Sequence, residues 1–139
     1  MKKLFFLIFR LELLLALLIL ISCRKTTSSN NNLIGQWQWV YSTGGIAVQT
    51  VKPMGNIVAI AFNKDSTYIY TENGIIQSND KYFITNDKIY GSIIHLVNYN
   101  GSKLWLSPNG EIYSIKNNQL EWGDYLISDG YSHFFQRIK

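Results

Sequence analysis

The pattern of apolar and polar positions divides the chain into three zones. Residues 4–9 are apolar, Arg10 and Glu12 interrupt the run, and residues 13–21 are apolar without exception. Residues 24–32, with the sequence RKTTSSNNN, contain no apolar side chain. In the rest of the chain, short runs rich in β-branched and aromatic residues alternate with turn-forming residues. This pattern predicts a leader, a polar connector and one folded domain.

The folded part predicts β-sheet, because no long window repeats apolar residues at the three- and four-residue spacing of a helix. Asn-Gly pairs begin at Asn73, Asn100 and Asn109, and both residue types tolerate the positive φ of tight hairpins. Further turns are predicted at 63–66, 86–87 and 117–118. The expected strands are roughly 36–43, 56–63, 66–72, 75–84, 88–97, 103–107 with 111–116, 119–126 and 132–138.

About eight strands joined in order by short turns predict an all-β fold, a small up-and-down antiparallel β-barrel. A meander of this size is expected to close, because closure removes the exposed sheet edges. By the two-residue period of a strand, Trp37, Trp39 and Tyr41 share one face of the first strand. His133 and Arg137 share one face of the last strand by the same rule.

The leader has the architecture of a signal peptide. Lys2 and Lys3 give it a positive start, and the nine apolar residues 13–21 cover about 14 Å as a helix. A bilayer's hydrocarbon core measures about 30 Å, so this run is too short to span it. The sequence therefore predicts a signal peptide over residues 1–22. An uncleaved membrane anchor over residues 4–21 is the alternative.

The leader ends in Leu20-Ile21-Ser22-Cys23, which resembles the bacterial lipobox. The resemblance implies that a diacylglyceryl group is attached to the Cys23 sulfur, that the chain is cut before this residue, and that palmitate-like acyl chains hold it to a membrane. Two or three such chains anchor stably where one does not. Residues 23–32 then form the lipidated cysteine and a flexible tether. Arg24 after the cysteine points to the outer membrane, with the periplasmic and exterior faces both open.

Charge argues against a nucleic-acid partner, and the cysteine count excludes an internal disulfide. The formal charge is +4, and the leader carries two of these net charges, so only about +2 remains on residues 23–139. This charge is too small and too dispersed for a nucleic-acid-binding surface. Cys23 is the only cysteine, which excludes an internal disulfide.

Gly35-Gln36-Trp37 resembles the Gly-x-Trp motif of lipocalins, and Arg137 matches the basic residue that packs over that tryptophan in the family. The implied contact is a cation–π interaction that joins the first strand to the last. The segments 33–47, 62–68 and 129–138 extend the likeness to small lipocalin-like lipoproteins of Bacteroidetes. The resemblance implies a lipocalin-like barrel over residues 33–139 and names no ligand.

Aromatic residues supply the candidate binding site. A cavity for a small apolar or amphiphilic ligand would be lined by Trp39, Tyr41, Phe62, Tyr70, Trp105, Trp122 and Phe135. The same side chains suit the core of a solid barrel, whose surface or rim then binds a protein or glycan. The carrier interpretation is preferred here, and it depends on the family resemblance.

The sequence gives little support for a catalytic site or a metal-binding site. Ser132 and His133 are adjacent on a predicted strand, so they point to opposite faces and cannot form a nucleophile–base pair. No histidine spacing suits zinc. Glu121, Asp124 and Asp129 lack the dense oxygen-ligand loop of calcium motifs. The prediction is therefore a protein without catalytic residues, metal or cofactor, and an enzyme is the third alternative.

Overall fold

The computed structural model describes residues 32–101 and 110–139, and every regular element there is a β-strand. The predicted leader, Cys23 and Trp105 lie outside the described residues. None of the described segments is a helix long and apolar enough to cross a membrane. The strands are β1 (Gly35–Gly44), β2 (Gln49–Val51), β3 (Val58–Phe62), β4 (Thr67–Glu72), β5 (Ile75–Asp87), β6 (Gly91–Leu96), β7 (Glu111–Lys116), β8 (Gln119–Asp124) and β9 (Tyr131–Arg137).

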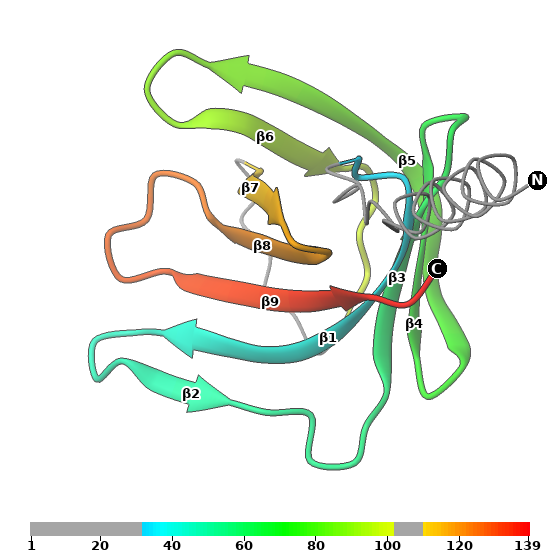
Figure 1. The fold of residues 1–139 in the computed structure, drawn as a ribbon, viewed down its shortest axis with the longest axis horizontal. Helices are drawn as coiled ribbons and strands as arrows, with labels where there is room; N and C mark the ends of the chain where they lie inside the picture. Colours follow the sequence, from blue (N-terminus) through cyan, green and yellow to red (C-terminus); the bar gives the residue numbers. More distant parts are fainter. Residues whose placement is uncertain (1–31, 102–109) are drawn as a thin grey trace, which may run out of the picture.

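These strands form a single antiparallel sheet that closes into a barrel (Figure 1). Each strand from β3 to β8 pairs with the next in the chain, and β1 completes the ring by pairing with both β3 and β9. β2 is a short extra strand beside the end of β1. Eight strands therefore close the barrel, and the prediction of a small up-and-down antiparallel β-barrel is confirmed.

The hairpin turns follow the predicted residues at two places. Asn73 and Gly74 have φ of 51° and 78°, and Asn117 and Asn118 have φ of 52° and 61°. Two consecutive residues with positive φ give the mirror-image turn that matches the twist of the flanking strands.

The turn predicted at Asn86 and Asp87 is wrong, because both residues belong to β5. The turn follows them at residues 88–90. The Asp87 carboxylate fixes it there, since Oδ1 accepts hydrogen bonds from the amides of Ile89 and Tyr90 at 2.7 and 3.0 Å.

A β-bulge in β1 corrects the expected position of Tyr41. The pairing of β1 with β9 shifts register between Trp39 and Tyr41, so an extra residue enters this strand. Tyr41 then pairs with Phe134 and stacks on it, with ring centroids 4.5 Å apart. Ser42 takes the buried position with 3% exposure. The expectation that Tyr41 shares a face with Trp37 and Trp39 is wrong, because the bulge breaks the two-residue period.

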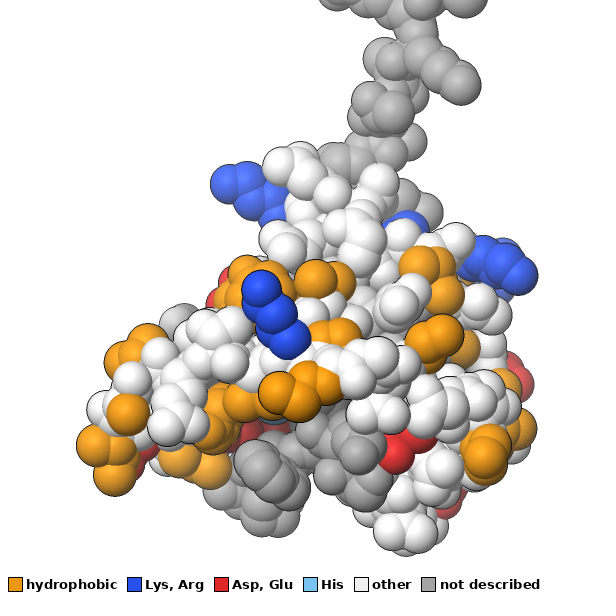
Figure 2. All heavy atoms as spheres, turned by 90° about the horizontal axis from the view of Figure 1, so that it is seen from below, with side chains coloured by type: hydrophobic (Ala, Val, Ile, Leu, Met, Phe, Trp, Pro, Cys, Tyr) orange, Lys and Arg blue, Asp and Glu red, His pale blue; other side chains and the backbone are white. Residues whose placement is uncertain are grey.

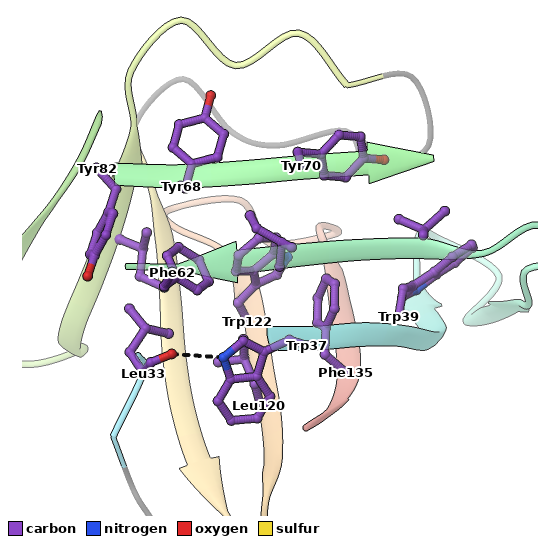
Figure 3. Packing of buried hydrophobic residues seen from close by; sticks show 13 residues of the cluster. Leu33, Trp37, Trp39, Phe62, Tyr68, Tyr70, Tyr82, Leu120, Trp122 and Phe135 are labelled. Carbon is purple, nitrogen blue, oxygen red and sulfur yellow. Dashed lines mark hydrogen bonds between the residues drawn. The ribbon is translucent and has the colours of Figure 1, made fainter. Parts of the chain in front are cut away.

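The core fills the inside of the barrel, and aromatic side chains from different strands point toward one another there (Figure 3). Ten of its side chains have less than 2% exposure: Trp37, Trp122, Tyr68, Tyr70, Phe62, Phe135, Ile60, Ile94, Leu120 and Val58. Their burial follows the two-residue period in β3, β4 and β8, where buried and more exposed positions alternate.

The barrel is joined across β1 and β9 by Trp37 and Arg137. The guanidinium carbon lies 4.1 Å from the centroid of the indole, within the range of a cation–π contact. Arg137 also donates from Nη1 to the carbonyl of Ile34 at 2.8 Å and from Nη2 to the carbonyl of Asn32. The indole Nε1 of Trp37 donates to the Leu33 carbonyl at 2.8 Å (Figure 3). These bonds tie the chain before β1 to the last strand.

Gly35 is required by the same junction. Its φ is 140°, a conformation that L side chains rarely adopt. A Cβ at this position would collide with Nη1 of Arg137 and lie 2.6 Å from the carbonyl oxygen of Lys139. The glycine of the Gly-x-Trp motif therefore makes room for the guanidinium and for the end of the chain.

Candidate functional site

The aromatic residues proposed to line a cavity are packed against one another. Trp39, Phe62, Tyr70, Trp122 and Phe135 all belong to the buried core. The Trp122 ring makes edge contacts with Phe62 and Phe135, at centroid distances of 6.1 and 4.8 Å. Tyr41 lies on the other side of the sheet, as the bulge requires, and Trp105 is outside the described residues. The described part of this set forms a packed interior.

A buried polar network lies beside this core. The indole Nε1 of Trp39 donates to Ser42 Oγ at 2.8 Å, and Ser42 Oγ lies 2.6 Å from Nδ1 of His133. Ser42 Oγ accepts a hydrogen bond from Trp39 and can donate its own hydroxyl proton to Nδ1. With Ser42 as the donor, the neutral imidazole carries its ring proton on Nε2.

Burial determines the charge state of His133. The side chain is 3% exposed, and burial lowers its pKa from 6.5 to about 4, because a charged imidazolium loses its hydration inside the barrel. His133 is therefore neutral at pH 7.

Two buried ring donors near this network have no hydrogen-bond partner in the described part of the chain. They are Nε1 of Trp122 and Nε2 of His133. Trp122 and His133 are directly opposed residues of β8 and β9, and both side chains are buried. A buried N–H without an acceptor is costly, so each donor favours an oxygen acceptor beside it.

The Ser42–His133 pair does not have the access that catalysis requires. A hydroxyl hydrogen-bonded to an imidazole is the chemistry of an activated nucleophile. Here, however, Ser42 is 3% exposed, and its oxygen already holds hydrogen bonds to Trp39 and His133. From the sequence, Ser132 was considered as the partner of His133. Ser42 was not recognised, because only the bulge in β1 brings its hydroxyl inside.

Six of the fifteen large hydrophobic side chains that are exposed in the described residues lie at three chain reversals, while others such as Met54 and Ile75 lie elsewhere. We name these three reversals the tip surface. It comprises residues 45–48 after β1, 88–90 after β5 and 125–130 after β8. Five aliphatic side chains protrude from it, and their exposed fractions are 93% for Ile46, 74% for Val48, 84% for Ile89, 62% for Leu126 and 47% for Ile127. Folding has left these side chains in water, whereas the core aromatic residues, such as Trp122 and Phe135, are buried.

The three reversals are held together by direct contacts. The amide of Gly45 donates to the carbonyl of Gly130 at 3.4 Å, which joins the first reversal to the third. The Tyr125 hydroxyl donates to Asp87 Oδ2 at 3.2 Å, and the Tyr90 and Tyr125 rings meet edge to face at 5.4 Å. All three reversals lie at the left-hand end of Figure 1, and apolar side chains gather at the same end when the molecule is seen from below (Figure 2).

Two of the protruding residues occupy a strained backbone conformation. Val48 has φ of 47° and Leu126 has φ of 63°. Left-handed conformations are uncommon for side chains larger than Gly, Asn or Asp, and for a β-branched residue such as valine they are outliers. Met54, outside the tip surface, has a φ of 45° and is also exposed, so this conformation occurs at the tips without being confined to them.

Two hollows flank the third reversal. One, of about 400 Å³, lies between the first and third reversals and is lined by Ile46, Gln49, Asp129 and Tyr131 among others. The other, of about 430 Å³, is lined by residues of β7, β8 and β9 and by Ile127. Gly123 lies in this second hollow. Both hollows open beside the aliphatic tips.

The acidic residues considered for calcium do not form a metal site. In residues 32–101 and 110–139, no group of three His, Cys, Asp or Glu side chains is arranged to hold a metal ion. Asp124 Oδ2 instead accepts a hydrogen bond from the Tyr131 amide at 2.8 Å, and Asp129 Oδ1 accepts one from Ser128 Oγ at 2.8 Å.

Comparison with known proteins adds no further site, because no protein-family model, no curated protein and no solved structure matches the chain.

Proposed function

We propose that this protein is a lipid-anchored, non-catalytic binding module of the bacterial envelope, with a filled lipocalin-like barrel and with the tip surface as its binding surface. The sequence left two interpretations of the aromatic residues open, a ligand cavity and a solid core. The packing of the described residues favours the solid core.

The anchor part of the proposal depends on the leader. Its apolar run is too short to span a bilayer as a helix, and it ends in the lipobox-like segment Leu20–Cys23. Acylation of Cys23 would account for the single cysteine of an exported chain. We place the protein at the outer membrane on the strength of Arg24.

One observation carries the choice of binding surface. Five aliphatic side chains protrude from three reversals that are tied to one another, while the predicted cavity residues Trp39, Phe62, Tyr70, Trp122 and Phe135 pack in the core. Exposed apolar patches on a folded protein mark interaction sites more often than accidents of sequence.

Site-specific photocrosslinking in the native host tests the binding surface. A photoreactive phenylalanine replaces Ile127 in the full-length protein, and a matched variant carries it at Lys116, which is exposed near the β7–β8 turn. We expect an adduct of defined mass at position 127 and none at position 116. Absence of any adduct, or equal labelling at both positions, would refute the tip surface as the working surface.

A second candidate function is a carrier of a small amphiphile. The unpartnered ring donors of Trp122 and His133 favour it, because a carboxylate or carbonyl oxygen on a ligand would satisfy them. Native mass spectrometry of the mature protein, isolated gently from its host, tests this candidate. A discrete extra mass that is lost on denaturation, and that is reduced in a Trp122→Phe variant, would support a carrier. A bare polypeptide mass would count against it.

A further inference from the structure

We propose that the occupant of the tip surface is a lipid bilayer, into which Ile46, Val48, Ile89 and Leu126 insert. This inference rests on the proposed function of the tip surface as a binding surface, and it names the partner. The four side chains protrude from three reversals, with Ile46 and Val48 in the same one, and their exposed fractions lie between 62% and 93%. A fluid acyl layer can cover aliphatic side chains that come from several reversals, whereas a folded protein partner must present a complementary surface of fixed shape.

Part of the tip backbone already has its hydrogen bonds within the protein. The amide of Val48 donates to the Gly45 carbonyl at 2.9 Å. The amides of Ile89 and Tyr90 donate to the Asp87 carboxylate, as described above. Backbone donors that are already satisfied within the loop avoid the cost of several kcal/mol that each unsatisfied group pays in hydrocarbon.

The charge of the tips indicates a neutral lipid surface. Within the three reversals, Lys88 and Asp129 are the charged residues, so their net charge is zero. Attraction to anionic headgroups is therefore not the driving force, and insertion should be insensitive to salt. Tyr90 and Tyr125, which meet edge to face in the second and third reversals, are of the residue type that favours the membrane–water interface.

The reach of the chain before the barrel agrees with this orientation. β1 has ten residues and leads from the start of the barrel to the first reversal, a length of about 33 Å. Residues 23–32 also number ten, and a fully extended segment of this length spans at most about 33–36 Å. A protein acylated at Cys23 can therefore place its tips on the same bilayer that holds its anchor.

Fluorescence quenching in vesicles tests the proposal with the mature lipidated protein. Because Cys23 is the only native cysteine and would be acylated, a cysteine introduced at Ala47 accepts a fluorophore alone. Ala47 is exposed in the first reversal, and a matched Lys64→Cys variant labels the exposed β3–β4 turn, away from the tips (Figure 1). Each labelled protein is reconstituted into phosphatidylcholine vesicles with spin-labelled acyl chains.

We expect the label at position 47 to shift its emission to the blue and to be quenched by the spin labels, in low and in high salt. The label at position 64 should remain unquenched. Ile46→Ser combined with Leu126→Ser should reduce quenching at position 47 to the level of position 64, with a melting temperature close to that of the parent protein. A quenching signal that survives this double substitution would overturn the proposal.

The remaining outcomes also separate the two proposals. No quenching at position 47 would refute bilayer insertion. A blue shift without quenching would refute it as well, since a protein partner or a second copy would then cover the tips. Quenching only with phosphatidylglycerol in the vesicles would overturn the neutral-lipid assignment. Labelling of Cys23 by the fluorophore would show that the proposed lipid anchor is wrong. The tip proposal would still be tested, because quenching of the label at position 47 can be compared with quenching of the label at position 64 when each protein is added to vesicles.

Discussion

The guanidinium of Arg137 lies over the indole of Trp37, with its central carbon 4.1 Å from the ring centroid. The two residues are also direct pairing partners of β1 and β9, where the barrel closes. Together with the hydrogen bonds of Arg137 to Ile34 and Asn32, this contact fixes the chain entering the barrel against the chain leaving it. The junction therefore contributes to the stability of the fold.

Arg137→Ala should accordingly lower the free energy of unfolding by about 1–2 kcal/mol, from the lost cation–π contact and charged hydrogen bonds. Arg137→Lys keeps the charge but loses the planar, two-donor head, and it should give an intermediate value. Urea unfolding followed by tryptophan fluorescence measures both variants. A free energy of unfolding unchanged by Arg137→Ala would contradict a stabilising role for the junction.

Stability should fall between neutral and mildly acidic pH because of His133. The unfolded chain binds a proton near pH 6.5, whereas burial lowers the pKa of the folded imidazole to about 4. The stabilisation is therefore complete above about pH 6.5 and is lost as the pH falls toward 4. The slope is about 1.4 kcal/mol per pH unit, which gives about 3 kcal/mol over the window.

Urea titrations at several pH values from 7 to 4.5 measure this loss. The range stays above the titration of Asp65, Asp80 and Asp87, whose pKa values are lowered from 3.8 by hydrogen bonds. His133→Gln should flatten the dependence, and His95→Gln, the same substitution at a less buried position, should preserve it. Equal slopes in the two variants would refute the assignment to His133.

Ser42→Ala should destabilise the barrel by about 2–3 kcal/mol, because it leaves the buried donor of Trp39 and Nδ1 of His133 without their shared partner. Ser132→Ala is the matched control. Ser132 is next to His133 in sequence, but it lies on the opposite side of β9 and should cost less than about 0.5 kcal/mol. Equal losses of unfolding free energy in the two variants would show that the Ser42 hydroxyl is not essential to the network.

The fold could be predicted from the sequence, but the tip surface could not, and the bulge in β1 shows why. Alternating apolar positions and Asn-Gly turns predicted the strands, because each depends on local rules. A single inserted residue between Trp39 and Tyr41 moved Tyr41 outward and Ser42 inward, and this register depends on the distant partner β9. The tip surface was missed for a related reason. Leu126 continues an apolar strand pattern, yet β8 ends at Asp124, and only the assembled barrel brings the three reversals together.

Replacing the strained aliphatic residues by glycine should stabilise the fold. A left-handed conformation at a residue other than Gly costs about 1–3 kcal/mol, and the greater chain entropy of glycine offsets about 0.5–1 kcal/mol of the relief. Val48→Gly and Leu126→Gly should therefore each raise the free energy of unfolding by about 1 kcal/mol. Ile46→Gly is the control, since Ile46 lies in the same reversal without a positive φ and should show no gain. Identical effects of Val48→Gly and Ile46→Gly would mean that Val48 is not strained.

Cys23→Ser should abolish anchoring without affecting the barrel, because the acyl chains would lose their only thiol. In cells fed labelled palmitate, the wild-type protein should take up label and the variant should not. The variant should also keep residues 1–22 and migrate as the larger precursor, because cleavage at a lipobox follows lipid attachment. Ser22→Ala, which keeps a small residue before the cysteine, should be labelled and cut normally. Label entering the Cys23→Ser protein would refute the lipid anchor, and a wild-type protein that retains its leader would identify residues 4–21 as an uncleaved anchor instead.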